Sequence, residues 1–231
     1  MIQAITWYNW YMKGIVLHGW GHNAEMWSSF IDKTAIHFSA IDLPGFGKQK
    51  LVSDSWGIPE YADWVVKEIE KHEDILLIGH SFGGRIAAEI ASRKFSWLKG
   101  LVLSGAPCIY RPSIKTQIKI YLAQLGKRIF PNKFQDRFLS KDLMDARKAG
   151  LERIFRAVVG YNQTKQLKEI DIPTLLIWGE NDSDAPVALA QEIQSYIRNS
   201  ELHILEHCGH NVFLENPNLF SGYVNTFIKT I

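Results

Sequence analysis

The sequence has few of the features that mark secreted, membrane-spanning or repetitive proteins. Only two cysteines occur in 231 residues, Cys108 and Cys208, so no disulfide framework is possible, and this usage is typical of a reducing compartment. No run of about 18 apolar residues is present that would span a bilayer. The first ten residues lack a basic start and a small-residue cleavage site, and no internal repeat is found. We therefore expect a cytoplasmic globular protein with no membrane segment.

What is present is a regular alternation of apolar runs and helical patterns. Hydrophobic residues make up 46% of the chain, which allows one sizeable core. Short strands separated by helices indicate an α/β fold, with a mostly parallel sheet covered by helices on both faces. The expected strands lie near residues 6–11, 14–17, 36–41, 75–78, 98–103, 174–178 and 202–205, and helices near 59–69, 82–92, 187–197 and 217–228.

The pattern changes between residues 108 and 169, where it is helical and basic. This segment holds 14 Lys and Arg against 5 Asp and Glu, whereas the rest of the chain holds 12 against 19. We expect a small helical cap, inserted into an α/β core made of residues 1–107 and 170–231. The basic cap would attract an acidic partner such as an acyl carrier protein, although a solvated helical surface needs no partner. The acidic remainder argues against nucleic acid as a partner.

A candidate nucleophile follows the apolar run 75–78. Gly79-His80-Ser81-Phe82-Gly83 matches the pattern GxSxG between a strand and a helix. Glycines on either side let the chain bend sharply, and the turn raises the Ser81 hydroxyl above the sheet at the start of a helix. This arrangement predicts a serine nucleophile.

A serine needs a base and a carboxylate that orients the base, in the chain order Ser, Asp or Glu, His. Asp182 follows the strand 174–178, with Asp184 as a rival, and His210 stands in a Gly-containing loop after the last strand. The other histidines fit less well. We expect His22, His37 and His72 in surface-like or early segments, and His203 and His207 to pack or to be exposed to solvent. The ring of His80, next to the serine, is expected to point away across the turn. A zinc site was considered where His203, His207, Cys208 and His210 crowd together, but no second ligand pair supports one.

An oxyanion hole needs two N–H donors. The residue after the nucleophile, Phe82, supplies one. The loop His18-Gly19-Trp20-Gly21 follows an early strand, and we expect the N–H of Trp20 to supply the other.

These motifs, together with Asp42-Leu-Pro-Gly-Phe-Gly47, resemble those of the α/β-hydrolase superfamily across nearly the whole chain. The segments 18–27 and 42–47 are most similar to the methyl ester esterases of biotin synthesis, which act on pimeloyl-carrier-protein methyl ester. The resemblance implies a triad of Ser81, Asp182 and His210, an oxyanion hole at Trp20 and Phe82, and no cofactor or metal.

The leading hypothesis is therefore a serine carboxylesterase that works through an acyl-enzyme. Its substrate contacts are expected at His18, Gly19 and Arg85 and at apolar cap residues: Ile118, Tyr121, Leu122, Leu125 and Phe130. The alternatives are a short-chain esterase of undefined substrate, a non-catalytic binding module, and a lyase of the menaquinone-pathway type. In the lyase, Arg85 grips a substrate carboxylate; otherwise we expect it to be exposed or paired with Glu89.

Overall fold

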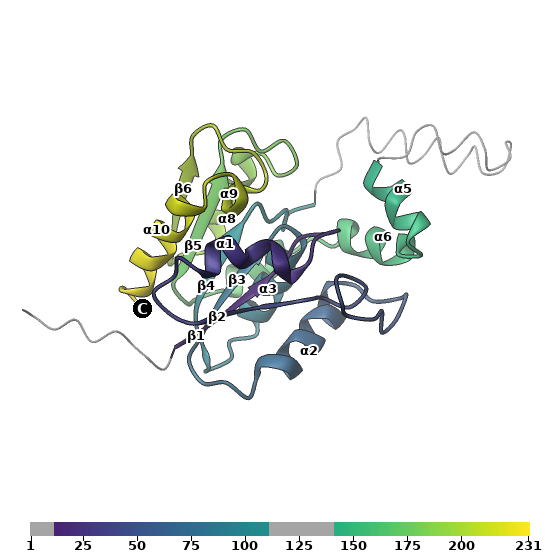
Figure 1. The fold of residues 1–231 in the computed structure, drawn as a ribbon, viewed down its shortest axis with the longest axis horizontal. Helices are drawn as coiled ribbons and strands as arrows, with labels where there is room; N and C mark the ends of the chain where they lie inside the picture. Colours follow the sequence, from purple (N-terminus) through teal and green to yellow (C-terminus); the bar gives the residue numbers. More distant parts are fainter. Residues whose placement is uncertain (1–11, 111–140) are drawn as a thin grey trace, which may run out of the picture.

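The structure, a computed structural model, describes residues 12–110 and 141–231 (Figure 1). The expected edge strand at 6–11 lies outside these residues. So do the predicted pocket residues Tyr121, Leu122 and Leu125, with Ile118 and Phe130.

Within the described residues, six strands form one parallel sheet in the order β2-β1-β3-β4-β5-β6. This confirms the predicted α/β fold. Since the strands run in the same direction, the loops that follow them open at one edge of the sheet. The strands are β1 (Lys13–Leu17), β2 (Phe38–Ile41), β3 (Ile75–His80), β4 (Leu98–Ser104), β5 (Thr174–Gly179) and β6 (Ser200–Leu205).

The helices pack on both faces of this sheet (Figure 1). The final helix begins and ends as predicted, whereas the short helices at 24–31 and 212–215 were not predicted, because one turn leaves no periodic pattern to read. The described helices are η1 (Ala24–Trp27), α1 (Ser28–Ile31), α2 (Ile58–Ile69), α3 (Phe82–Ser92), α5 (Lys141–Lys148), α6 (Glu152–Gly160), α7 (Thr164–Glu169), α8 (Val187–Tyr196), α9 (Val212–Glu215) and α10 (Pro217–Ile228). None of them combines the length and the hydropathy needed to cross a bilayer.

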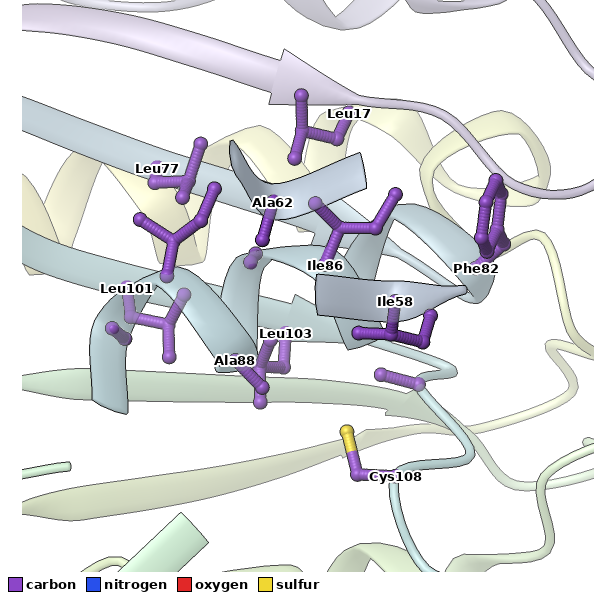
Figure 2. Close-up of a cluster of buried hydrophobic side chains, with 14 of the residues drawn as sticks. Leu17, Ile58, Ala62, Leu77, Phe82, Ile86, Ala88, Leu101, Leu103 and Cys108 are labelled. Atoms are coloured by element: carbon purple, nitrogen blue, oxygen red, sulfur yellow. The ribbon is translucent and has the colours of Figure 1, made fainter. Parts of the chain in front are cut away.

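Alternate residues of the central strands face two different cores. Leu77 and Leu101 face one core, which packs against α2, α3 and α8, and Figure 2 shows part of it around the α3 residue Ile86. Leu76 and Val102 face the other core, which is rich in aromatic rings from η1, α1, α9 and α10. Burial on both faces explains why these strands read as continuous apolar runs in the sequence.

In the described part of the predicted cap, α6 lies against a loop at the carboxyl edge of the sheet, whereas α7 packs against α3 and α8. The Phe155 ring in α6 lies edge-on to Trp20, with centroids 5.1 Å apart. Where the segment leaves and rejoins the core, the Gln163 N–H donates to the Cys108 carbonyl at 2.9 Å. These contacts place α6 beside the loop that was predicted to carry an oxyanion donor.

Candidate active site

The turn between β3 and α3 gives Ser81 an unusual backbone. Its φ is +51° and its ψ is −112°, a region that residues other than glycine rarely adopt. The two flanking glycines are required by space: a Cβ on Gly79 would lie 2.5 Å from the Gly83 carbonyl oxygen, and one on Gly83 would lie 2.4 Å from the Leu17 carbonyl oxygen. The Ser81 N–H donates to the Ser104 carbonyl at 2.9 Å, which fastens the turn to β4.

The same turn brings the loop after β1 against the start of α3. The Gly83 N–H donates to the His18 carbonyl at 3.1 Å. The N–H of Phe82 lies in the first turn of α3, where such groups have no partner within the helix. Neither it nor the N–H of Trp20 bonds to another group in residues 12–110 and 141–231. These two donors lie in the two backbone segments that the bond from Gly83 to His18 holds together.

His18 shapes this loop from within. Its ring is fully buried, its Nδ1–H donates to the Gly19 carbonyl at 2.8 Å, and its Nε2 accepts from the Leu43 N–H at 3.0 Å. Burial lowers the pKa of His18, which keeps the ring neutral and able to accept. Because both nitrogens are engaged with backbone, His18 holds the loop that carries Gly19 and Trp20. Its expected contact with substrate stays a prediction.

Asp182 and His210 meet at the ends of β5 and β6. His210 Nδ1 lies 2.8 Å from Asp182 Oδ2, and the Asp182 side chain is buried. The second carboxylate oxygen accepts from the backbone N–H groups of Asp184 and Ala185, at 2.9 and 2.8 Å. Asp184, the rival carboxylate, therefore contributes its backbone to the site, and its side chain is exposed.

Two features near His210 were not predicted. Gly105, after β4, has a φ of +54°, and a Cβ there would lie 3.0 Å from the His210 ring and 3.3 Å from Asp182 Oδ2. The breaker sequence Ser104-Gly-Ala-Pro107 signals this position. Glu215, in α9, accepts from the N–H groups of Gly209 and Asn211, at 2.5 and 3.0 Å, so it fixes the loop on either side of His210. A glutamate five residues from a histidine gives no sequence signal of this role.

No hydrogen bond joins Ser81 to His210 within the described residues. Other contacts show that the two lie close together, because His80, the neighbour of Ser81, has its ring centroid 4.8 Å from that of His210. Catalytic hydrogen bonds are commonly long without substrate and shorten in the reactive complex. Ser81 and His210 therefore lie at the same edge of the sheet, on neighbouring loops.

The prediction that His80 points away from the site is wrong. Its ring is fully buried, packs against His210, and stacks on His22 at a centroid distance of 5.8 Å. His22 was expected on the surface and is instead half-buried beside the site. His203, by contrast, stacks on Tyr223 at 4.1 Å, which confirms its packing role.

Both expectations for the position of Arg85 are also wrong. The residue is only 3% exposed, and Glu89 pairs with Arg93 instead, at 3.5 Å. The guanidinium donates to the Tyr161 carbonyl and, at 3.3 Å, to Gln163 Oε1, while the Gln163 amide donates back to the Arg85 carbonyl at 2.8 Å. Arg85 thus ties α3 to the segment between α6 and α7.

Comparisons with known proteins agree with this geometry. The alpha/beta hydrolase family matches residues 15–221. The pimeloyl-[acyl-carrier protein] methyl ester esterase of Yersinia pseudotuberculosis is 24% identical, over 95% of this chain and 96% of that protein. Among solved structures, an esterase from Exiguobacterium antarcticum has a TM-score of 0.74 at 21% identity, covering 94% of this chain and 92% of the other. MenH from S. aureus has a TM-score of 0.69 at 22% identity, covering 95% and 94%. The chain therefore belongs to the alpha/beta hydrolase family and is an enzyme of the hydrolase class.

Proposed function

We propose that this protein is a serine carboxylesterase whose triad is Ser81, Asp182 and His210. The observation that carries the proposal is the Asp182–His210 pair, 2.8 Å apart with a buried carboxylate, at the same sheet edge as a serine on a strained strand-to-helix turn. A carboxylate bonded to Nδ1 leaves Nε2 as the free base and stabilises the imidazolium once it forms.

In the proposed reaction, His210 Nε2 takes the proton of Ser81 as Oγ attacks the ester carbonyl. The carbonyl oxygen becomes an oxyanion that accepts from the N–H groups of Trp20 and Phe82. Collapse of this intermediate breaks the bond to the alcohol, which leaves with the proton from His210. Water then attacks the acyl-enzyme with His210 again as base, and the acid is released from Ser81.

The proposed substrate is a methyl ester of an acyl chain carried by an acidic protein. Support comes from the relative named a pimeloyl-[acyl-carrier protein] methyl ester esterase and from the excess of basic residues in 108–169. Two buried cysteines that form no disulfide suit the cytoplasm, where such carriers act. A short-chain esterase without a carrier is the second candidate, and the solved esterase from Exiguobacterium antarcticum has this fold.

The lyase alternative loses its main argument in this structure. It depends on Arg85 being available to a substrate carboxylate, whereas the Arg85 guanidinium is bonded to Tyr161 and Gln163.

Hydrolysis of short p-nitrophenyl esters tests the chemistry. Ser81→Ala is expected to abolish turnover and labelling by a fluorophosphonate, and mass spectrometry of the labelled wild type is expected to place the adduct on Ser81. Ser92→Ala is the matched control, since that serine caps the far end of the same helix by donating to the Glu89 carbonyl. Retained turnover in Ser81→Ala would remove Ser81 from the mechanism.

A second experiment tests the carrier. Turnover of pimeloyl-carrier methyl ester is compared with that of dimethyl pimelate at low and high salt. We expect the wild type to prefer the carrier-bound ester, and this preference to weaken as the salt concentration rises. The preference is expected to be smaller in Arg153→Glu, on the cap. Lys229→Glu, at the end of α10, is the control and is expected to keep the wild-type preference. Equal turnover of the two esters at all salt concentrations would favour the short-chain esterase.

A further inference from the structure

A second imidazole lies beside the proposed catalytic histidine. His80 precedes Ser81 in the chain, and its ring is fully buried between His210, His22 and Phe213, at centroid distances of 4.8, 5.8 and 5.0 Å. The triad chemistry makes no use of it. A buried polar ring in this position therefore needs its own explanation.

The hydrogen bonding of His80 fixes where its proton resides. Nδ1 lies 3.1 Å from the Ser104 carbonyl oxygen, which can only accept, so Nδ1 carries the hydrogen. The same oxygen accepts the Ser81 N–H at 2.9 Å. Burial, followed by the neighbouring His210 and His22, lowers the pKa of His80 and keeps the ring neutral. Nε2 is consequently a buried lone pair, one residue from the nucleophile.

Asn211 follows His210, whose ring centroid lies 4.8 Å from that of His80, so the Asn211 side chain lies beside the His80 ring. His80 Nε2 and Asn211 Oδ1 are both buried, and neither has a hydrogen bond of normal geometry. Two acceptors cannot bond to each other, and a buried polar atom left without a partner destabilises the fold. A half-turn of the Asn211 amide places its Nδ2–H opposite Nε2 and removes the conflict.

We propose that His80 and Asn211 form a bridge, in which the Asn211 amide donates to His80 Nε2 and His80 Nδ1–H donates to the Ser104 carbonyl, and that this bridge sets the position of His210 over Ser81. The bridge connects Asn211, which follows the proposed base His210, to His80, which precedes the proposed nucleophile Ser81. His80 takes no part in bond making or proton transfer and acts only through the placement of His210, so it is a positioning residue. The inference rests on the proposed esterase function for its kinetic consequence.

A double-mutant cycle tests the bridge. His80→Phe keeps the ring shape and removes both hydrogen bonds, and Asn211→Leu keeps the side-chain size and removes the donor. Each single variant is expected to lower kcat for p-nitrophenyl butyrate about 10- to 100-fold, with KM within about twofold, because a misplaced base slows chemistry more than binding. The double variant is expected to be no slower than the slower single variant. Multiplicative losses, or an effect on KM alone, would overturn the proposal.

Two further measurements separate positioning from loss of folding. His80→Gln offers a donor to the Ser104 carbonyl and an acceptor to the Asn211 amide. Its kcat is expected to be at least about fivefold higher than that of His80→Phe. His203→Phe, on the far strand β6, is the matched control and is expected to keep wild-type kcat. Recovery by glutamine at equal thermal stability supports the bridge, and its absence at equal stability contradicts it.

A readout without turnover distinguishes failure of the bridge from failure of the proposed function. In protein labelled with ¹⁵N-histidine, long-range ¹H–¹⁵N correlations are expected to show His80 protonated on Nδ1 only. The Nε2 resonance is expected to shift in Asn211→Leu, because its hydrogen bond is lost. A proton on Nε2, or an Nε2 resonance indifferent to Asn211, would overturn the bridge whether or not the protein hydrolyses esters.

Discussion

The two halves of the candidate site are held in place by different kinds of contact. The nucleophile turn is fixed by backbone: Ser81 bonds to the Ser104 carbonyl, and Gly83 bonds to the His18 carbonyl, where no side chain would fit. The loop of His210 is fixed by carboxylates, through Asp182 on the ring and Glu215 on the flanking N–H groups. Backbone contacts thus hold the candidate nucleophile, whereas side chains orient the candidate base. The two halves should respond differently to substitution.

The largest effect is expected from Asp182→Asn, which breaks the side-chain half at its centre. An amide cannot stabilise the imidazolium or hold the required tautomer, so kcat should fall about 10³- to 10⁴-fold. Because the amide oxygen still accepts from Ala185 and Asp184, thermal stability should change little. Ester hydrolysis and thermal unfolding measure the two outcomes. Asp184→Asn is the matched control, and a comparable loss of activity there would reassign the triad carboxylate.

Gly83→Ala breaks the backbone half instead. A Cβ would lie 2.4 and 2.6 Å from the carbonyl oxygens of Leu17 and His18, so β1 and α3 must separate. We expect kcat to fall about 100-fold through the damaged oxyanion hole, together with a clear loss of thermal stability. Gly222→Ala in α10 is the control, because a Cβ there meets nothing. Wild-type stability in Gly83→Ala would show that the turn is not held as tightly as its contacts indicate.

A smaller effect is expected from Glu215→Ala, which loosens the base loop without touching the ring. Loss of the two bonds to Gly209 and Asn211 should lower kcat about tenfold and speed hydrogen exchange around residues 207–212. Glu215→Gln keeps an acceptor oxygen and should lie between alanine and wild type. Unchanged exchange in Glu215→Ala would mean that Glu215 does not restrain this loop.

The smallest effect is expected on the pH dependence of the unfolding free energy, through three histidines that lie between the two halves of the site. Burial lowers the pKa of His18, His22 and His80. These rings are neutral in the fold but bind protons in the unfolded chain below about pH 6.5, so the unfolding free energy should fall as pH falls from there. Each histidine contributes at most about 1.4 kcal/mol per pH unit.

Urea unfolding between pH 7.5 and 5.0 measures this slope. In His80→Phe the slope of the unfolding free energy against pH should decrease by up to about 1.4 kcal/mol per pH unit, because one fewer proton is bound on unfolding. His203→Phe should leave the slope unchanged. A stability that does not vary over this range would contradict the buried, neutral state of these rings.

Much of this architecture could be predicted because its signals are local. Apolar runs marked the strands, and GHSFG marked the nucleophile, since a sharp turn between β3 and α3 requires glycines at fixed spacing. The errors fell on side chains whose partners are distant in the chain. Arg85 meets Gln163, and His80 meets His210, only after the sheet has brought their loops together. Glu215 was missed for a different reason, because a carboxylate that bonds to backbone N–H groups leaves no pattern in the sequence.

The contact between Trp20 and Phe155 has a consequence for altering this enzyme. The aromatic ring of a cap helix rests on the residue whose N–H is proposed to receive the oxyanion, with centroids 5.1 Å apart. Reshaping the cap at residue 155 to admit longer or bulkier acyl groups would also disturb that donor, so substrate range and turnover would change together. Redesign of acyl preference should therefore leave Phe155 in place and begin elsewhere in the cap.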